Sequence, residues 1–397
     1  MVPVTPEALI ATADRCVKCG LCLPHCPTYG LYRDEAESPR GRISLVQALI
    51  SGALDDTPAL RAHLDHCLLC RNCERACPSQ VAYGELIDGV RAHLTAGAKP
   101  GWLLQTLTNG AMLNKLLPLG AFARKAGVAK GLPVKLRRLA ALASRPRSEP
   151  FPQITSFARG TGRVALFGGC VGSVTDRRAL SAARLLLSSL GFEVVTPAAS
   201  FCCGAMHQHG GFAGEAAERL EETAGVLSGL AVDAVLAVAS GCGAQLVEHA
   251  GLSSPVHDIS AFLAQVAWPE SMLGALHGQV VGLHQPCSLR NVMREDGDVA
   301  RFLSRFDGLE VVPVQGDGCC GAAGMHMVAY PEMAKTLAAP LVDQIRRGGV
   351  RTLLTSNTGC ALHLDAELEA AGVPVAVRHP VEWIVDHLPS TTGATND

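Results

Sequence analysis

The sequence has no long hydrophobic run and no large excess of one charge. No apolar stretch among its 397 residues reaches the roughly 18 residues that a membrane-spanning helix requires. Its first residues, MVPVTPEALI, lack the charged and apolar parts of a signal peptide. The formal net charge of -2 provides no global field for nucleic acid. We therefore expect a cytoplasmic protein with no nucleic-acid partner.

A dinucleotide-binding fingerprint is missing as well. No G-x-G-x-x-G follows a predicted strand, and no FAD-binding motif is evident. A chain without a flavin or nicotinamide site cannot accept a hydride by itself. If the protein takes part in an oxidation, the step at the substrate must occur on a partner.

Cysteine, in contrast, is abundant. The chain has 16 cysteines, and in a chain without an export signal such density indicates metal ligation rather than disulfides. Eight lie between Cys16 and Cys77 and eight between Cys170 and Cys360, with none in the gap. The gap predicts a domain boundary.

The first block contains the run C-x2-C-x2-C-x3-C-P twice, ending at Pro27 and Pro78. This is the spacing of ferredoxins with two 4Fe-4S clusters, in which three thiolates bind one cube and the fourth reaches the other. Zinc is the alternative, but zinc does not need the C-P ending. The rule predicts cluster 1 on Cys16, Cys19, Cys22 and Cys77, and cluster 2 on Cys67, Cys70, Cys73 and Cys26. The insert PRGRISLVQALISGAL predicts a helix. Its Arg40 and Arg42 could contact a partner or the edge of a quinone, but an arginine in a turn is more often solvated or caps a backbone carbonyl.

The second block is an internal repeat. Cys170, Cys202 and Cys203 recur 117 residues later and Cys242 recurs 118 residues later, as Cys287, Cys319, Cys320 and Cys360. Each copy alternates strand and helix signals, from RVALFGGC to AVLAVASGC and from QVVGLHQPC to RTLLTSNTGC, which predicts parallel β/α units. The cysteines follow strand ends, where parallel sheets bind ligands. We expect two sites that face each other.

Each copy resembles the cysteine-rich CCG domain of heterodisulfide reductases, through the C…CCG…C pattern around Gly204 and Gly321. That pattern has a fifth cysteine at the positions of Ala239 and Asn357, so each site here has four. Four thiolates suit an ordinary 4Fe-4S cube or a zinc ion. One cysteine of each CC pair can instead be a buried apolar residue. Five nearby histidines could replace a thiolate at one iron, although each alone is more typical of a structural role: His207, His209, His284, His326 and His363.

Together with the runs HLDHCLLCRNCERACPS and FCCGAMHQHG, these motifs make nearly the whole chain similar to the iron-sulfur subunits of glycolate oxidase. The resemblance implies FAD-binding partner subunits that oxidise glycolate, a quinone-type electron acceptor, and no catalytic residue on this chain. Related subunits serve D-lactate and glycerol 3-phosphate. Two other readings stay open: disulfide reduction at the CCG sites, and a zinc-stabilised docking module.

The resulting prediction is an α+β chain, with an α-helical two-cluster ferredoxin domain followed by duplicated α/β CCG domains with parallel sheets. We place the ferredoxin domain at 1–95, a basic helical segment and linker at 96–162, and the repeats at 163–278 and 279–397. Between Lys99 and Arg163 the sequence has twelve Lys or Arg and one acid, Glu149. This segment is predicted to form amphipathic helices before the linker RPRSEPFPQ. It suits the flavin subunit or anionic lipid at the inner face of the plasma membrane, or it is a solvated helix face.

Overall fold

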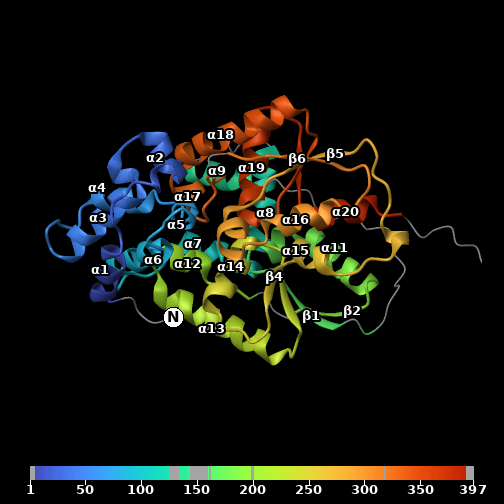
Figure 1. Ribbon diagram of the computed structural model, residues 1–397, viewed down its shortest axis with the longest axis horizontal. Coiled ribbons are helices and arrows are strands. Elements are labelled where there is room, and N and C mark those ends of the chain that lie inside the picture. The colour runs from blue at the N-terminus through green and yellow to red at the C-terminus, as the bar shows by residue number, and fades with distance from the viewer. Residues whose placement is uncertain are drawn as a thin grey trace, which may run out of the picture.

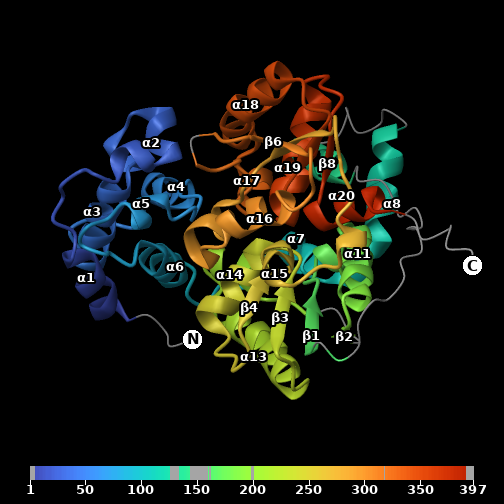
Figure 2. The same cartoon turned by 45° about the vertical axis from the view of Figure 1, so that its right-hand side comes forward.

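The computed structural model describes residues 5–125, 134–143, 160, 162–197, 201–316 and 318–389. The N-terminal part is helical, and two four-stranded parallel sheets follow it. In both views the N-terminal helices lie at one side, and the two sheet-containing halves lie one above the other (Figure 1, Figure 2). The predicted fold class is confirmed.

Six helices form the N-terminal part: α1 (Pro6–Asp14), α2 (Pro27–Tyr32), α3 (Pro39–Ile50), α4 (Pro58–Asp65), α5 (Asn72–Arg75) and α6 (Tyr83–Leu94). Helices α1, α3 and α4 start in the same way, with proline at the first position and a side-chain cap before it, from Thr5, Ser38 and Thr57. Proline loses nothing there, because the first helical N–H has no partner within the helix. Helix α3 is the helix predicted for the insert.

Arg42 and Arg40 have different places. The Arg42 side chain is fully buried, and it pairs with Glu37 and donates to the carbonyl oxygens of Glu37 and His63. Its role is structural, so the partner or quinone-edge alternative is wrong for Arg42. Arg40 is partly exposed and pairs with Glu35 at 2.6 Å. It also borders a pocket lined by cysteines of both ferredoxin motifs, here called the first cysteine pocket.

Three helices lie in the sequence between the N-terminal part and the first repeat: α7 (Trp102–Leu107), α8 (Gly110–Lys125) and α9 (Val134–Leu142). They confirm the helices predicted for the basic segment, whereas the linker RPRSEPFPQ lies outside the described residues. Helix α9 packs against α19 of the second repeat, where Arg138 pairs with Glu367 at 2.6 Å. At least one cation of the basic segment is therefore part of the protein interior.

The first repeat contains β1 (Gly162–Phe167), β2 (Phe192–Val195), β3 (Ala234–Ala237) and β4 (Val256–Asp258) in the order β2-β1-β3-β4. The second contains β5 (Val280–Leu283), β6 (Glu310–Pro313), β7 (Thr352–Leu354) and β8 (Ala376–Arg378) in the order β6-β5-β7-β8. The identical topology bears out the duplication. Strands β4 and β8 were not expected, because VHD and AVR are too short to show a period.

The main helices of the first repeat are α11 (Arg177–Ser189), α13 (Ala213–Gly229), α14 (Ser240–His249) and α15 (Ile259–Gln265). Those of the second are α16 (Asp296–Leu303), α18 (Pro331–Gly348), α19 (Thr358–Ala370) and α20 (Pro380–His387). Helix α11 packs on α20 and α15 on α16, and one apolar cluster contains Leu186, Ile259, Phe302 and Trp383. Because the repeats share this core, their sheets hold a fixed relation to each other. In the described part of the chain, no helix has the length and apolar character to cross a membrane.

Candidate iron-sulfur and cysteine sites

The first pocket brings the two ferredoxin motifs together. It is lined by Cys16, Cys19 and Cys22 of the first motif and by Cys73 and Cys77 of the second. Four of these five cysteines are the set that the crossing rule predicts for cluster 1, and the fifth, Cys73, is predicted for cluster 2. Cys19 is exposed, and burial raises the pKa of the Cys22 thiol.

The second set is more deeply placed. Cys67, Cys70 and Cys73 are buried. Burial raises the pKa of the Cys70 and Cys73 thiols well above the usual range, and the charge of nearby Cys26 adds to both shifts. Buried thiols at such close quarters do not ionise together without a cation, and a bound metal supplies that charge. The donor set therefore fits an iron-sulfur cluster.

The backbone of the two motifs turns in the same way. Two and four residues after the first cysteine, each loop has a residue with positive φ: Lys18 and Gly20 in one, Leu69 and Arg71 in the other. This region disfavours residues other than glycine, and such strain clusters where a site requires it. Both loops therefore use the same backbone conformation, which can direct three thiols at one centre.

The two CCG quartets share one pattern of contacts. In the first repeat Cys170 is hydrogen-bonded to Cys202, and Cys203 to Cys242. In the second, Cys287 is hydrogen-bonded to Cys319, and the sulfurs of Cys320 and Cys360 lie 3.1 Å apart. The hydrogen bond from Cys170 lowers the pKa of Cys202 to about 4, and that from Cys287 lowers the pKa of Cys319. Each quartet therefore comes together as two hydrogen-bonded pairs of cysteines, and four thiolates are the number that a cube or a zinc ion takes.

The glycine of each CCG run is required by its surroundings. Gly204 has φ +82° and Gly321 has φ +89°, and a Cβ on either would lie 2.6 Å from a carbonyl oxygen, that of Ala216 in α13 or Ala334 in α18. Their amides point to the first cysteine of the pair, at 3.5 Å for Cys202 and 3.4 Å for Cys319. Glycine is the residue that permits this close approach.

Both quartets line one large cavity. The cavity has a volume of about 800 Å³, and its wall includes all eight CCG cysteines as well as Cys67 of the second ferredoxin motif. Apolar side chains of α7, α8 and α9 close another side, among them Leu103, Leu113 and Leu139. The second quartet is the nearer to the ferredoxin motif, since Cys70 and Cys319 belong to one buried cluster and Asn291 donates to the Cys70 carbonyl at 2.6 Å.

Comparison with known proteins agrees with this architecture. Residues 12–81 match a family model described as a 4Fe-4S dicluster domain, and residues 164–247 and 281–365 match one described as a cysteine-rich domain. The probable glycolate oxidase iron-sulfur subunit of Bacillus subtilis is 30% identical over 91% of this chain and 90% of its own. The chain belongs to the family of glycolate oxidase iron-sulfur subunits.

Other relatives agree with this assignment. The glycolate oxidase iron-sulfur subunit of Escherichia coli is 28% identical over 93% of this chain and 92% of its own. Lactate utilization protein A of Macrococcus caseolyticus is 24% identical over 58% of this chain and 99% of its own. A member of this family is an electron-transferring subunit of an oxidoreductase, and its 4Fe-4S clusters supply one-electron steps.

The position of the missing fifth cysteine has acquired another contact in the second repeat. Asn357 donates to the Cys360 sulfur at 3.3 Å, and its side-chain oxygen accepts from the amide of Gly241 at 3.1 Å. The same side chain therefore joins the last cysteine of one repeat to the cysteine loop of the other. Ala239 has no polar side chain to do the same for the first repeat.

The five candidate histidines divide into two groups. His209 is paired with Asp88 at 3.0 Å, and His363 contacts Arg138 and the carbonyl of Ala334, so both have structural partners. His207 and His326 are buried, His207 beside the Cys202 thiol and His326 beside the backbone of Gly321, and His284 lies beside Cys320 and Cys360. Burial lowers the pKa of His284 and of His326 to about 4, which leaves both rings neutral at pH 7.

An apolar stripe on α8 was not found by sequence reasoning. Met112, Leu116, Leu119 and Phe122 repeat at helical spacing and are all exposed, as is Trp102 on α7. Leu116 and Leu119 also line the cavity, as do Leu113 and Leu117 of the same helix, whereas Met112 and Phe122 do not. The sequence shows this helix to be amphipathic, but only packing shows that these apolar side chains remain exposed within the described chain.

Proposed function

We propose that this chain carries electrons from a FAD-binding partner subunit that oxidises glycolate or a similar 2-hydroxy acid to a quinone-type acceptor. The observation that carries the proposal is the common cavity, whose wall joins the second ferredoxin motif to both CCG quartets. The cluster and quartet ligands named above, and the four domains at 1–95, 96–162, 163–278 and 279–397, are part of the proposal. The substrate is read by the partner, which is where hydride chemistry takes place.

The first cysteine pocket is the proposed entry point. Two apolar residues of its loop, Val17 and Leu21, are 68% and 56% exposed, and Cys19 is exposed beside them. An exposed apolar rim around a redox site is typical of a surface that docks a partner protein. A flavoprotein seated here would place its cofactor close to cluster 1.

The cavity is the proposed exit. The leucine and alanine side chains on its wall suit a quinone ring better than a charged acceptor, in the part of the cavity that the centres on the eight CCG cysteines would leave free. Reduction of a disulfide here is a weaker candidate, because Ala239 and Asn357 replace the fifth cysteines of the heterodisulfide reductase pattern.

A quinone oxidation assay tests the exit. We expect a short-chain ubiquinone analogue to reoxidise the dithionite-reduced holoprotein, followed as the return of visible iron-sulfur absorbance. Ala140→Trp should slow this reaction, because Ala140 is 4% exposed and lines the cavity. Phe122→Trp, on the outer side of α8, is the matched control and should react at the wild-type rate. A rate unchanged by Ala140→Trp would exclude the cavity as the quinone site.

The stripe on α8 further suggests where the quinone comes from. We infer that Met112, Leu116, Leu119 and Phe122 contact the surface of an anionic bilayer, at the inner face of the plasma membrane. Exposed Lys99 and Lys115 lie in the basic segment, which has a single acid, and each cation near such a surface contributes about 1 kcal/mol. A helix with apolar and basic residues on its outer side is typical of interfacial binding.

Vesicle sedimentation tests this contact. Met112 is 49% and Phe122 71% exposed, and neither lines the cavity, so replacing both with glutamate leaves the core intact while removing two apolar contacts and adding two repulsive charges. Binding to vesicles that contain phosphatidylserine should fall at least about tenfold. The control is the double variant Val17→Glu, Leu21→Glu, whose two changes lie at the first cysteine pocket. If the control lost binding instead, the membrane would lie at the ferredoxin end.

A further inference from the structure

The two CCG repeats differ at one position beside their cysteines. Three residues before the first cysteine, the first repeat has Phe167 and the second has His284. Phe167 ends β1, and its ring belongs to the apolar cluster that contains Cys203. His284 directly follows β5 and is 6% exposed. The same backbone position therefore presents a hydrocarbon ring to one quartet and an imidazole to the other.

A second replacement accompanies the first. The pairing of Leu166 with Leu236 in one sheet matches that of Leu283 with Leu354 in the other, so Ala237 and Thr355 occupy equivalent places. The Thr355 hydroxyl and the Nδ1 atom of His284 are 3.0 Å apart. An apolar pair has thus become a hydrogen-bonded polar pair. Because the apolar pair already fills this place in the first repeat, packing alone does not require the exchange.

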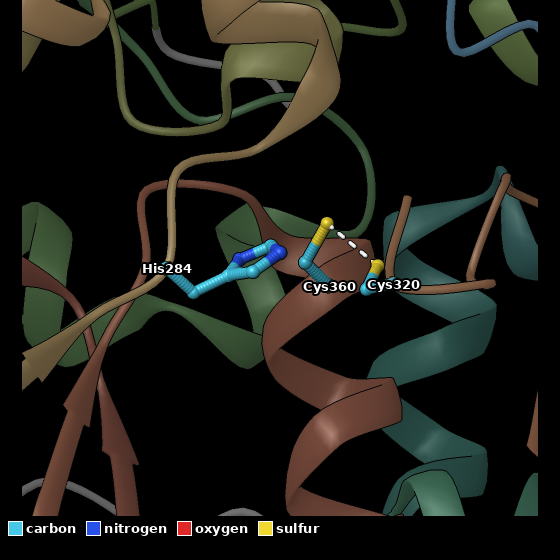
Figure 3. A group of neighbouring side chains, drawn as sticks. All are labelled: His284, Cys320 and Cys360. Carbon is cyan, nitrogen blue, oxygen red and sulfur yellow. Dashed lines mark hydrogen bonds between the residues drawn. The ribbon is translucent and has the colours of Figure 1, made fainter. Parts of the chain in front are cut away.

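The imidazole points at the thiols. A ring nitrogen of His284 and the sulfurs of Cys320 and Cys360 all lie within 4.8 Å of one another. Figure 3 shows the ring directed toward Cys360, with Cys320 beyond it. Histidines that bind metals usually donate their other N–H to a neighbouring group, which fixes the ring. Thr355 can accept from Nδ1–H in this way, which leaves the lone pair of Nε2 for a metal.

We propose that Nε2 of His284 is a ligand of an iron-sulfur centre held by the second quartet, in place of one of its four thiolates, whereas the first quartet provides only thiolates. A neutral imidazole donates less charge to iron than a thiolate does, and exchange of cysteine for histidine raises the reduction potential of iron-sulfur centres. The two repeats would then hold unequal centres. The one with the higher potential is the one whose Cys319 packs with Cys70 of the ferredoxin half. This assignment concerns a ligand and does not depend on the identity of the electron acceptor.

Pulsed EPR on the reduced holoprotein tests the assignment. In wild type grown with ¹⁵N-imidazole histidine we expect the strong coupling of a directly bonded nitrogen, and its isotope change relative to the ¹⁴N protein. His284→Phe, which copies the first repeat, should abolish it. His284→Cys should retain iron while losing the coupling, and should move one midpoint potential to a more negative value. This second variant keeps the test open if His284→Phe folds poorly.

His326→Gln is the matched control. His326 is a buried histidine of the same repeat that lies beside Cys319 and the backbone of Gly321, but it is not part of the trio with Cys320 and Cys360. The coupling should persist in this variant. Its persistence in His284→Phe, its loss in His326→Gln alone, or the finding of zinc in place of iron in the second repeat would each overturn the assignment.

Discussion

Replacing Cys77 with alanine should damage cluster 1, although Cys77 belongs to the second ferredoxin motif. Its thiol lines the pocket of Cys16, Cys19 and Cys22, and a cube that loses one of four thiolates is lost or loses iron. We expect the iron content to fall by up to about four atoms per chain. The EPR spectrum of the reduced variant should match that of Cys19→Ala, because Cys19 is assigned to cluster 1 under both crossed and uncrossed ligation.

The reciprocal variant completes the test. Cys26→Ala should match Cys70→Ala, because the charge of Cys26 acts on the buried thiols of Cys70 and Cys73. If each motif instead bound its own cluster, Cys77→Ala would resemble Cys70→Ala and Cys26→Ala would resemble Cys19→Ala. Four spectra therefore decide between crossed and uncrossed ligation without reference to enzyme activity.

The sequence predicted the architecture of the protein better than it predicted individual side-chain contacts. The repeat of four cysteines, with its alternating strand and helix signals, predicted two parallel sheets of equal topology, whereas the crossed ferredoxin sets stay a prediction from cysteine spacing. Strands β4 and β8 were not predicted, because three residues are too few to show an alternating pattern. The structural role of Arg42 was not predicted, because a sequence pattern does not reveal its ion pair with Glu37, 5 residues earlier.

The differences between the repeats were also hidden. In the sequence, Asn357 is only the absence of a cysteine, and its contacts with Cys360 and Gly241 depend on how the two sheets are placed. His284 was one of five similar candidates until the strand register set it opposite Thr355. Such roles arise from long-range packing, which local patterns do not encode.

Removing one cysteine from each CC pair should show whether both repeats hold clusters. With a cube in each CCG site as well as in each ferredoxin site, the wild type would contain about sixteen irons, and Cys203→Ala and Cys320→Ala would each remove up to about four. Both sulfurs are buried and hydrogen-bonded to the last cysteine of their quartet, so neither is a surface thiol. Iron, acid-labile sulfide and zinc are measured together on anaerobically purified protein.

The two variants should differ in their effect on electron transfer. Cys319 packs with Cys70 of the ferredoxin half, whereas among the described apolar clusters no cysteine of the first quartet shares one with Cys70. Loss of the second centre should therefore slow quinone-dependent reoxidation more than loss of the first. About eight irons in wild type and both variants, with no zinc, would confine the clusters to the ferredoxin half. Zinc lost from a variant in place of iron would make that repeat a structural docking module, since zinc has no redox chemistry to contribute.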